Sequence, residues 1–85
     1  MNTDLVKEII KKSMKINHIF INSDDNVHYK AIIISDDFKD LNLINRQRKV
    51  NKILNKLIIE GEIHAITLKT YTKDEWEKIK FKCFN

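Results

Sequence analysis

Three histidines are the side chains of this sequence best suited to chemistry, although their spacing forms no local metal motif. His18, His28 and His64 lie far apart along the chain, and no HxxxH arrangement is present. A single histidine is more often a structural residue than a metal ligand, so both interpretations stay open for each of them. Two neutral imidazoles would supply only half of a four-ligand centre, and a second molecule would have to complete it.

The other reactive residues form no catalytic pattern. GxGxxG, P-loop, nucleophile-elbow and HExxH motifs are absent. The acid pairs Asp24-Asp25 and Asp36-Asp37 are candidates for general acid and base chemistry, but both fall in expected turns, where aspartate accepts backbone hydrogen bonds. The one cysteine, Cys83, has no partner for an internal disulfide, which fits a reducing compartment. We therefore expect a protein that is not an enzyme.

Hydrophobic periodicity and turn residues predict three helices and three strands that would position these side chains. In chain order they are a helix over residues 3–14, strands over 18–22 and 27–35, a long helix that Gly61 ends, a strand over 63–69, and a helix that the capping box Thr72–Glu75 opens. This α-β-β-α-β-α order predicts an α+β fold, a two-layer α/β sandwich in which the helices cover one face of a three-stranded mixed sheet.

The predicted topology offers a way to bring two imidazoles together. His28 opens the second strand and His64 begins the third, and a helical crossover joins strands that run parallel. Parallel strands begin at the same edge of a sheet, so we expect His28 and His64 to lie near each other.

Length and composition indicate one globular domain over residues 1–85. The chain has 42% hydrophobic and 33% charged residues, which is ordinary for a folded protein. Its longest apolar runs, 31–34 and 57–59, are far shorter than the roughly 20 residues that cross a bilayer. The first residues resemble no secretory signal, so we expect a cytoplasmic protein without a membrane partner.

The net charge of +4 has two explanations. Clustered cations bind phosphates, and the exposed face of the long helix would offer Arg46, Arg48, Lys49 and Lys52 to a nucleic acid. Lysine outnumbers arginine 14 to 2, however, which also fits a solvated basic surface that reflects compositional bias. Trp76 likewise is either a stacking platform for a base or a core residue.

Several motifs taken together resemble the BolA family. They are Ile63-His64-Ala65, Leu68-Lys69-Thr70-Tyr71-Thr72, Glu75-Trp76, Asn45-Arg46-Gln47-Arg48, and His28-Tyr29-Lys30 followed by an aliphatic run and Ser35-Asp36. The short loop between the first two strands, residues 23–27, is most similar to the IbaG (YrbA) branch. The resemblance covers nearly the whole chain in order, and it implies a class II KH-like fold.

The resemblance also implies a function. Members of the family form heterodimers with monothiol glutaredoxins, in which a [2Fe–2S] cluster bridges the two proteins and glutathione supplies a thiolate. By this resemblance His64 matches the ligand histidine, and His28 stands in for a second ligand near the hairpin loop. The implied role is a non-enzymatic adaptor in iron–sulfur trafficking or in the iron, redox and acid-stress response, a monomer or weak homodimer when alone. The alternative is a DNA-binding regulator, although the GXXG loop of RNA-binding KH domains is absent.

Overall fold

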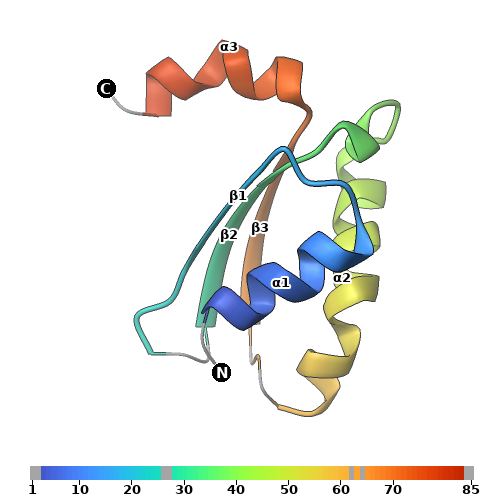
Figure 1. Ribbon diagram of the computed structural model, residues 1–85, viewed down its shortest axis with the longest axis vertical. Helices are drawn as coiled ribbons and strands as arrows, with labels where there is room; N and C mark the ends of the chain where they lie inside the picture. Colours follow the sequence, from blue (N-terminus) through green and yellow to red (C-terminus); the bar gives the residue numbers. More distant parts are fainter. Residues whose placement is uncertain (1–2, 26–27, 62, 64, 84–85) are drawn as a thin grey trace.

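The computed structural model describes residues 3–25, 28–61, 63 and 65–83, with side chains of the last helix described as far as Ile79. The elements in chain order are α1 (Thr3–Ser13), β1 (His18–Asn22), β2 (His28–Ile34), the short 3₁₀ helix η1 (Asp36–Phe38), α2 (Leu43–Ile59), β3 (Ala65–Tyr71) and α3 (Lys73–Cys83) (Figure 1). This confirms the predicted α-β-β-α-β-α order. None of the helices in these ranges is long and apolar enough to cross a bilayer.

The three strands form one mixed sheet in the order β1-β2-β3. β1 pairs antiparallel with β2, and β2 pairs parallel with β3 from His28 opposite Ala65 to Ile34 opposite Tyr71. β3 therefore lies two residues further along the chain than the predicted 63–69. Ile63 has the apolar character of a strand residue, but its amide donates to the carbonyl of Leu57 at 3.3 Å and closes the end of α2.

One face of the sheet packs against α1 and α2 and holds the main core. Alternate residues of each strand point toward these helices, as the two-residue period of a strand requires. The fully or nearly buried members of this cluster are Val6, Ile10, Met14, Tyr29, Ala31, Ile33, Phe38, Val50, Leu54, Leu57 and Ile63. The two-layer α/β sandwich predicted from the sequence is thus confirmed.

α3 departs from the prediction that every helix covers the same face. Its Trp76 is buried, and the indole lies 5.8 Å from the ring of Phe20 and 5.9 Å from that of Tyr71. Both rings belong to strand positions that alternate with core-facing residues, so they point to the opposite side of the sheet. α3 therefore packs over one end of that second face, apart from α1 and α2 (Figure 1).

The ends of the long helix follow from local chemistry. Asn42 caps α2, because its side-chain oxygen accepts a hydrogen bond from the amide of Asn45 at 2.9 Å. Gly61 follows the last turn with a φ of 78°, a left-handed conformation that glycine adopts without a steric penalty. The predicted stop at Gly61 is confirmed.

Candidate functional site

His28 stands at the first position of β2, where the hairpin loop fixes its backbone and its ring. The loop hydroxyl of Ser23 donates to the His28 carbonyl at 2.8 Å, and the His28 amide donates to Oδ1 of Asp25 at 2.9 Å. The other carboxylate oxygen, Oδ2, lies 2.6 Å from Nδ1 of the imidazole. The side chain remains 64% exposed, so a residue held by three contacts to Ser23 and Asp25 still faces solvent.

The parallel pairing of β2 and β3 places the starts of both strands at one edge of the sheet. His28 pairs with Ala65, the residue that follows His64 in the sequence. The prediction that the two strands are parallel neighbours is therefore confirmed. His64 itself lies outside the described residues, and its approach to His28 stays a prediction.

The third histidine, His18, is not part of this edge. β1 runs antiparallel to β2, and His18 pairs with Ile34 at the end of β2 remote from His28. In the ranges that the structure describes, no three His, Cys, Asp or Glu side chains are grouped to hold a metal ion. The described chain thus supplies one oriented imidazole at the candidate site.

A carboxylate on one ring nitrogen is the arrangement that many metal-bound histidines use. Such a partner fixes the ring and its tautomer and raises the basicity of the nitrogen that binds the metal. With Nδ1 engaged by Asp25, Nε2 would be the atom offered to iron. An open hollow of about 240 Å³ lies beside His28, and Ser23, Asp24, Ala65 and Thr67 are among the residues that line it. Among the described residues, His28 therefore fits the role of one ligand in a shared metal centre.

The four cations predicted to contact nucleic acid do not share one exposed face. Arg48, Lys49 and Lys52 are exposed on α2. The expectation that Arg46 is exposed with them is wrong, because only 11% of its side chain is accessible. Its Nε donates to the Leu41 carbonyl at 2.8 Å, which draws the guanidinium toward the protein.

Arg46 instead links α2 to the end of β3 and to the first turn of α3. Its two terminal nitrogens donate to the two carboxylate oxygens of Glu75 at 2.6 and 3.2 Å, and Nη1 also approaches the Thr70 carbonyl at 3.4 Å. The hydrogen bonds from Arg46, followed by the one from the Thr72 amide, lower the pKa of Glu75. No sequence pattern indicated this ion pair, because its partners lie 29 residues apart on different elements.

The capping box of α3 is confirmed in both directions. The Thr72 amide donates to Oε1 of Glu75 at 2.8 Å, and the Glu75 amide donates to Oγ1 of Thr72 at 3.2 Å. The same carboxylate therefore caps α3 and receives Arg46.

In each acid pair, one carboxylate accepts a hydrogen bond from a backbone amide. Asp25 accepts from the His28 amide, and Oδ2 of Asp37 accepts from the Lys15 amide at 2.9 Å. Buried Ser35 braces the same junction, since its hydroxyl donates to the Lys15 carbonyl and accepts from the Asp37 amide at 3.1 Å. These contacts support the interpretation of both pairs as turn residues.

Comparison with known proteins decides the family. The family model described as BolA-like protein matches residues 3–75. The chain belongs to the BolA family. The resemblance that the sequence motifs indicated is thereby confirmed.

Relatives of this BolA-like protein cover almost its full length. A protein of Buchnera aphidicola subsp. Schizaphis graminum is 37% identical over 78 residues, which span 92% of this chain and 96% of the relative. The acid stress protein IbaG of Escherichia coli is 23% identical over 78 residues, 92% of each chain. The solved structure of BolA1 from Arabidopsis thaliana superposes with a TM-score of 0.77 at 26% identity, covering 88% of this chain and 96% of that one.

Proposed function

We propose that this BolA-like protein is a non-enzymatic cytoplasmic adaptor that shares a [2Fe–2S] cluster with a monothiol glutaredoxin and glutathione. Membership of the family supports the proposal through the partnership that the sequence resemblance implies. The relation to a protein named for acid stress supports a role in the iron, redox and acid-stress response, or in iron–sulfur cluster trafficking.

The observation that carries the proposal is the oriented, exposed imidazole of His28 at the edge where β2 and β3 begin. Nδ1 of His28 is held by Asp25, and the paired residue on β3 is Ala65, next in sequence to His64. Two imidazoles at this edge would make half of a four-ligand centre, and the cysteine of a glutaredoxin and the thiolate of glutathione would complete it.

The shared cluster would carry one-electron chemistry or be passed on as cargo, and imidazole ligands raise its reduction potential relative to thiolates. The chain's own residues present and orient the ligands. Asp25 fixes the His28 ring, and the Ser23 hydroxyl holds the backbone carbonyl of the same residue. The fold keeps this edge in place because β2 pairs with β3 from His28 onward and with β1 from Lys30 onward.

Co-purification of the chain with a monothiol glutaredoxin and glutathione under anaerobic conditions tests the proposal. A coloured heterodimer is expected, and its visible spectrum should change in His64→Ala and in His28→Ala. His18→Ala is the matched control, because His18 lies at the far end of the β1–β2 ladder. Failure to form a coloured heterodimer, or spectra that all three variants leave unchanged, would overturn the adaptor role.

A second candidate function, duplex DNA binding, is supported by the exposed cations Arg48, Lys49 and Lys52 on α2. Phosphate contacts would make the affinity for a duplex fall steeply with salt concentration. Arg48→Ala combined with Lys49→Ala should then weaken duplex binding, while His64→Ala should leave it unchanged. Electrophoretic mobility shifts at two salt concentrations separate this role from the adaptor role.

A further inference from the structure

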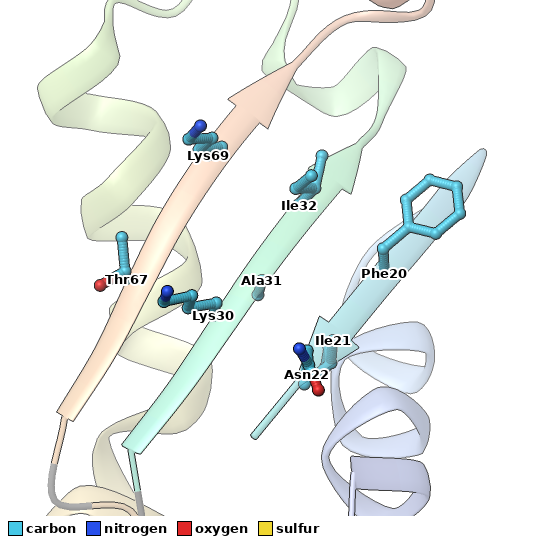
Figure 2. A pocket seen from close by; sticks show the side chains of 8 residues that line it. All are labelled: Phe20, Ile21, Asn22, Lys30, Ala31, Ile32, Thr67 and Lys69. Atoms are coloured by element: carbon cyan, nitrogen blue, oxygen red, sulfur yellow. The ribbon is translucent and has the colours of Figure 1, made fainter. Parts of the chain in front are cut away.

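The second face of the sheet carries side chains that take part in neither proposed function. We define the open face as six outward positions of the three strands that lie beside and beyond the part that α3 covers, namely Phe20, Asn22, Lys30, Ile32, Thr67 and Lys69 (Figure 2). Figure 2 looks onto this face, with the helices behind the sheet. These side chains line an open hollow of about 240 Å³.

The centre of the open face is a small apolar platform. Phe20 is 47% exposed, and Ile32 lies beside it on β2, because Phe20 and Ile32 are paired across the ladder. Trp76 of α3 stands beside the ring on the same face of the sheet, with its indole centroid 5.8 Å from that of Phe20. Phe20 therefore contacts α3 on one side and remains accessible to solvent elsewhere.

Two lysines flank this platform. Ile32 pairs with Lys69 and Lys30 pairs with Thr67, so the two lysines are diagonal neighbours on adjacent strands. Strand spacing and rise place their Cα atoms about 8 Å apart. Neither lysine has an ion-pair partner among the described residues, and the three strands contain no aspartate or glutamate. The positive charge of the open face is thus left for a ligand to neutralise.

The polar groups at the edges of the platform can make directional hydrogen bonds. Asn22 on β1 and Thr67 on β3 are both exposed and line the same hollow. An amide both donates and accepts, as does a hydroxyl, which suits the edge of a nucleobase. The positive region formed by Lys30 and Lys69 does not extend to the hairpin loop, because Asp24 and Asp25 line the neighbouring hollow beside His28.

From this arrangement we infer that the open face binds single-stranded nucleic acid. A base stacks on Phe20, the backbone phosphates meet Lys30 and Lys69, and Asn22 and Thr67 contact the base edge. Only an unpaired strand can offer a base to the ring, because bases in a duplex are stacked on each other. An acidic peptide would satisfy the lysines but would leave the ring and the hydrogen-bonding groups beside it unused. This site lies across the sheet from the basic residues of α2.

Fluorescence anisotropy with the full chain tests the assignment. The probes are a labelled eight-nucleotide RNA, the DNA strand of the same sequence, and a duplex of that sequence, each at low and at high salt. Once Arg48→Ala with Lys49→Ala has removed cations of α2, we expect both single strands to bind more tightly than the duplex. Lys30→Ala with Lys69→Ala should reduce the salt slope by about 1.4, since each single-strand phosphate contact contributes about 0.7.

Two variants make the test specific. Phe20→Leu keeps an apolar side chain but removes the aromatic face, and it should weaken single-strand binding about ten-fold. Arg48→Ala with Lys49→Ala removes the same number of charges from α2 as the lysine pair removes from the sheet, and it should leave single-strand binding unchanged. The emission of Trp76, the one tryptophan of the chain, reports whether Phe20→Leu still holds α3 in place.

The proposal is overturned by any of four results. They are tighter binding of the duplex by the Arg48→Ala and Lys49→Ala double variant, equal losses in the two double variants, unaltered binding in Phe20→Leu with native Trp76 emission, and displacement of the oligonucleotide by polyglutamate at an equal charge concentration. If Trp76 emission changes, Phe20→Tyr replaces Phe20→Leu and should retain binding, because it preserves the ring. Loss of binding in Phe20→Tyr would then count against stacking.

Discussion

At the scale of single residues, the Asp25–His28 pair is the main feature of the candidate metal edge, the edge of the sheet where β2 begins at His28 and β3 begins at Ala65. One oxygen of the carboxylate accepts a hydrogen bond from the His28 amide, and the other contacts the imidazole. The Asp25 side chain therefore orients both the backbone and the ring of His28. A carboxylate that holds the other nitrogen of a metal-bound histidine raises metal affinity by about 10- to 100-fold. A ligand histidine in this loop would therefore depend on its neighbour three residues earlier.

Asp25→Asn should weaken cluster retention in the glutaredoxin complex by about 10-fold or more. The amide keeps the size of the carboxylate but removes the charge that holds the imidazole. The measurement is the decay of the visible absorbance of the complex in the presence of an iron chelator. Asp24→Asn is the matched control, because Asp24 is the exposed acid next in sequence, and decay rates that are equal in the two variants would contradict the role given to Asp25.

At the scale of elements, the position of α3 depends on two contacts from different sides. Trp76 packs against Phe20 and Tyr71 on the second face of the sheet, while Glu75 binds Arg46 of α2. The guanidinium and carboxylate form a two-point pair, which fixes orientation as well as distance. Arg46 therefore belongs to the scaffold of the fold.

The Arg46–Glu75 pair should make stability depend on pH in the acid range. The hydrogen bonds to Glu75 lower its pKa in the folded state, so the stabilisation is present above the ordinary glutamate value of about 4.3 and is lost as pH falls through the lower folded value. Glu75 is 45% exposed, and solvent screening keeps the effect below about 1 kcal/mol. Urea unfolding between pH 5 and pH 2 should show a shallower fall in unfolding free energy for Glu75→Gln than for the unmodified chain.

Arg46 variants provide the control for that measurement. Arg46→Lys keeps the charge but loses the two-point geometry and the bond to the Leu41 carbonyl, so it should recover only part of the stability that Arg46→Ala loses. We expect Arg46→Ala to cost about 1–2 kcal/mol at pH 7, because a largely buried hydrogen-bonding group is removed. Identical pH profiles for Glu75→Gln and the unmodified chain would contradict this account.

Local signals in the sequence were sufficient for the order of elements and for two helix ends, the end of α2 and the start of α3. The Thr72–Glu75 capping box and the Gly61 stop depend on residues within one turn, and both are present as predicted. The start of β3 and the side of the sheet that α3 covers depend on partners elsewhere in the chain. Ile63 closes α2 through Leu57, and Trp76 meets rings from β1 and β3, so periodicity within each segment could not reveal either contact.

The candidate site, like the fold, was predictable from the sequence only in part. The parallel pairing that brings the starts of β2 and β3 to one edge followed from the order of elements. The burial of Arg46 did not follow from the order of elements, because its partner Glu75 is on α3. The contact between Asp25 and the His28 ring was also not predicted. A carboxylate three residues before a histidine in a turn is a signal that could have indicated it.

At the scale of the whole molecule, the sheet separates three surfaces. One face holds the core beneath α1 and α2, and the exposed cations Arg48, Lys49 and Lys52 lie on the outer side of α2. The other face is covered by α3 at one end and carries the open face beyond it. The candidate metal edge lies at the start of β2, where the hollow beside His28 shares Asn22, Lys30 and Thr67 with the open face. A protein bound at the metal edge would thus approach the open face, whereas duplex DNA on α2 would not.

Native mass spectrometry of the anaerobically reconstituted mixture tests the central claim most directly. The adaptor account predicts one species with the mass of this chain, one monothiol glutaredoxin, one glutathione and one [2Fe–2S] cluster, and predicts that His64→Ala depletes it. Observation of the cluster only in glutaredoxin homodimers, with this chain always free, would contradict the account.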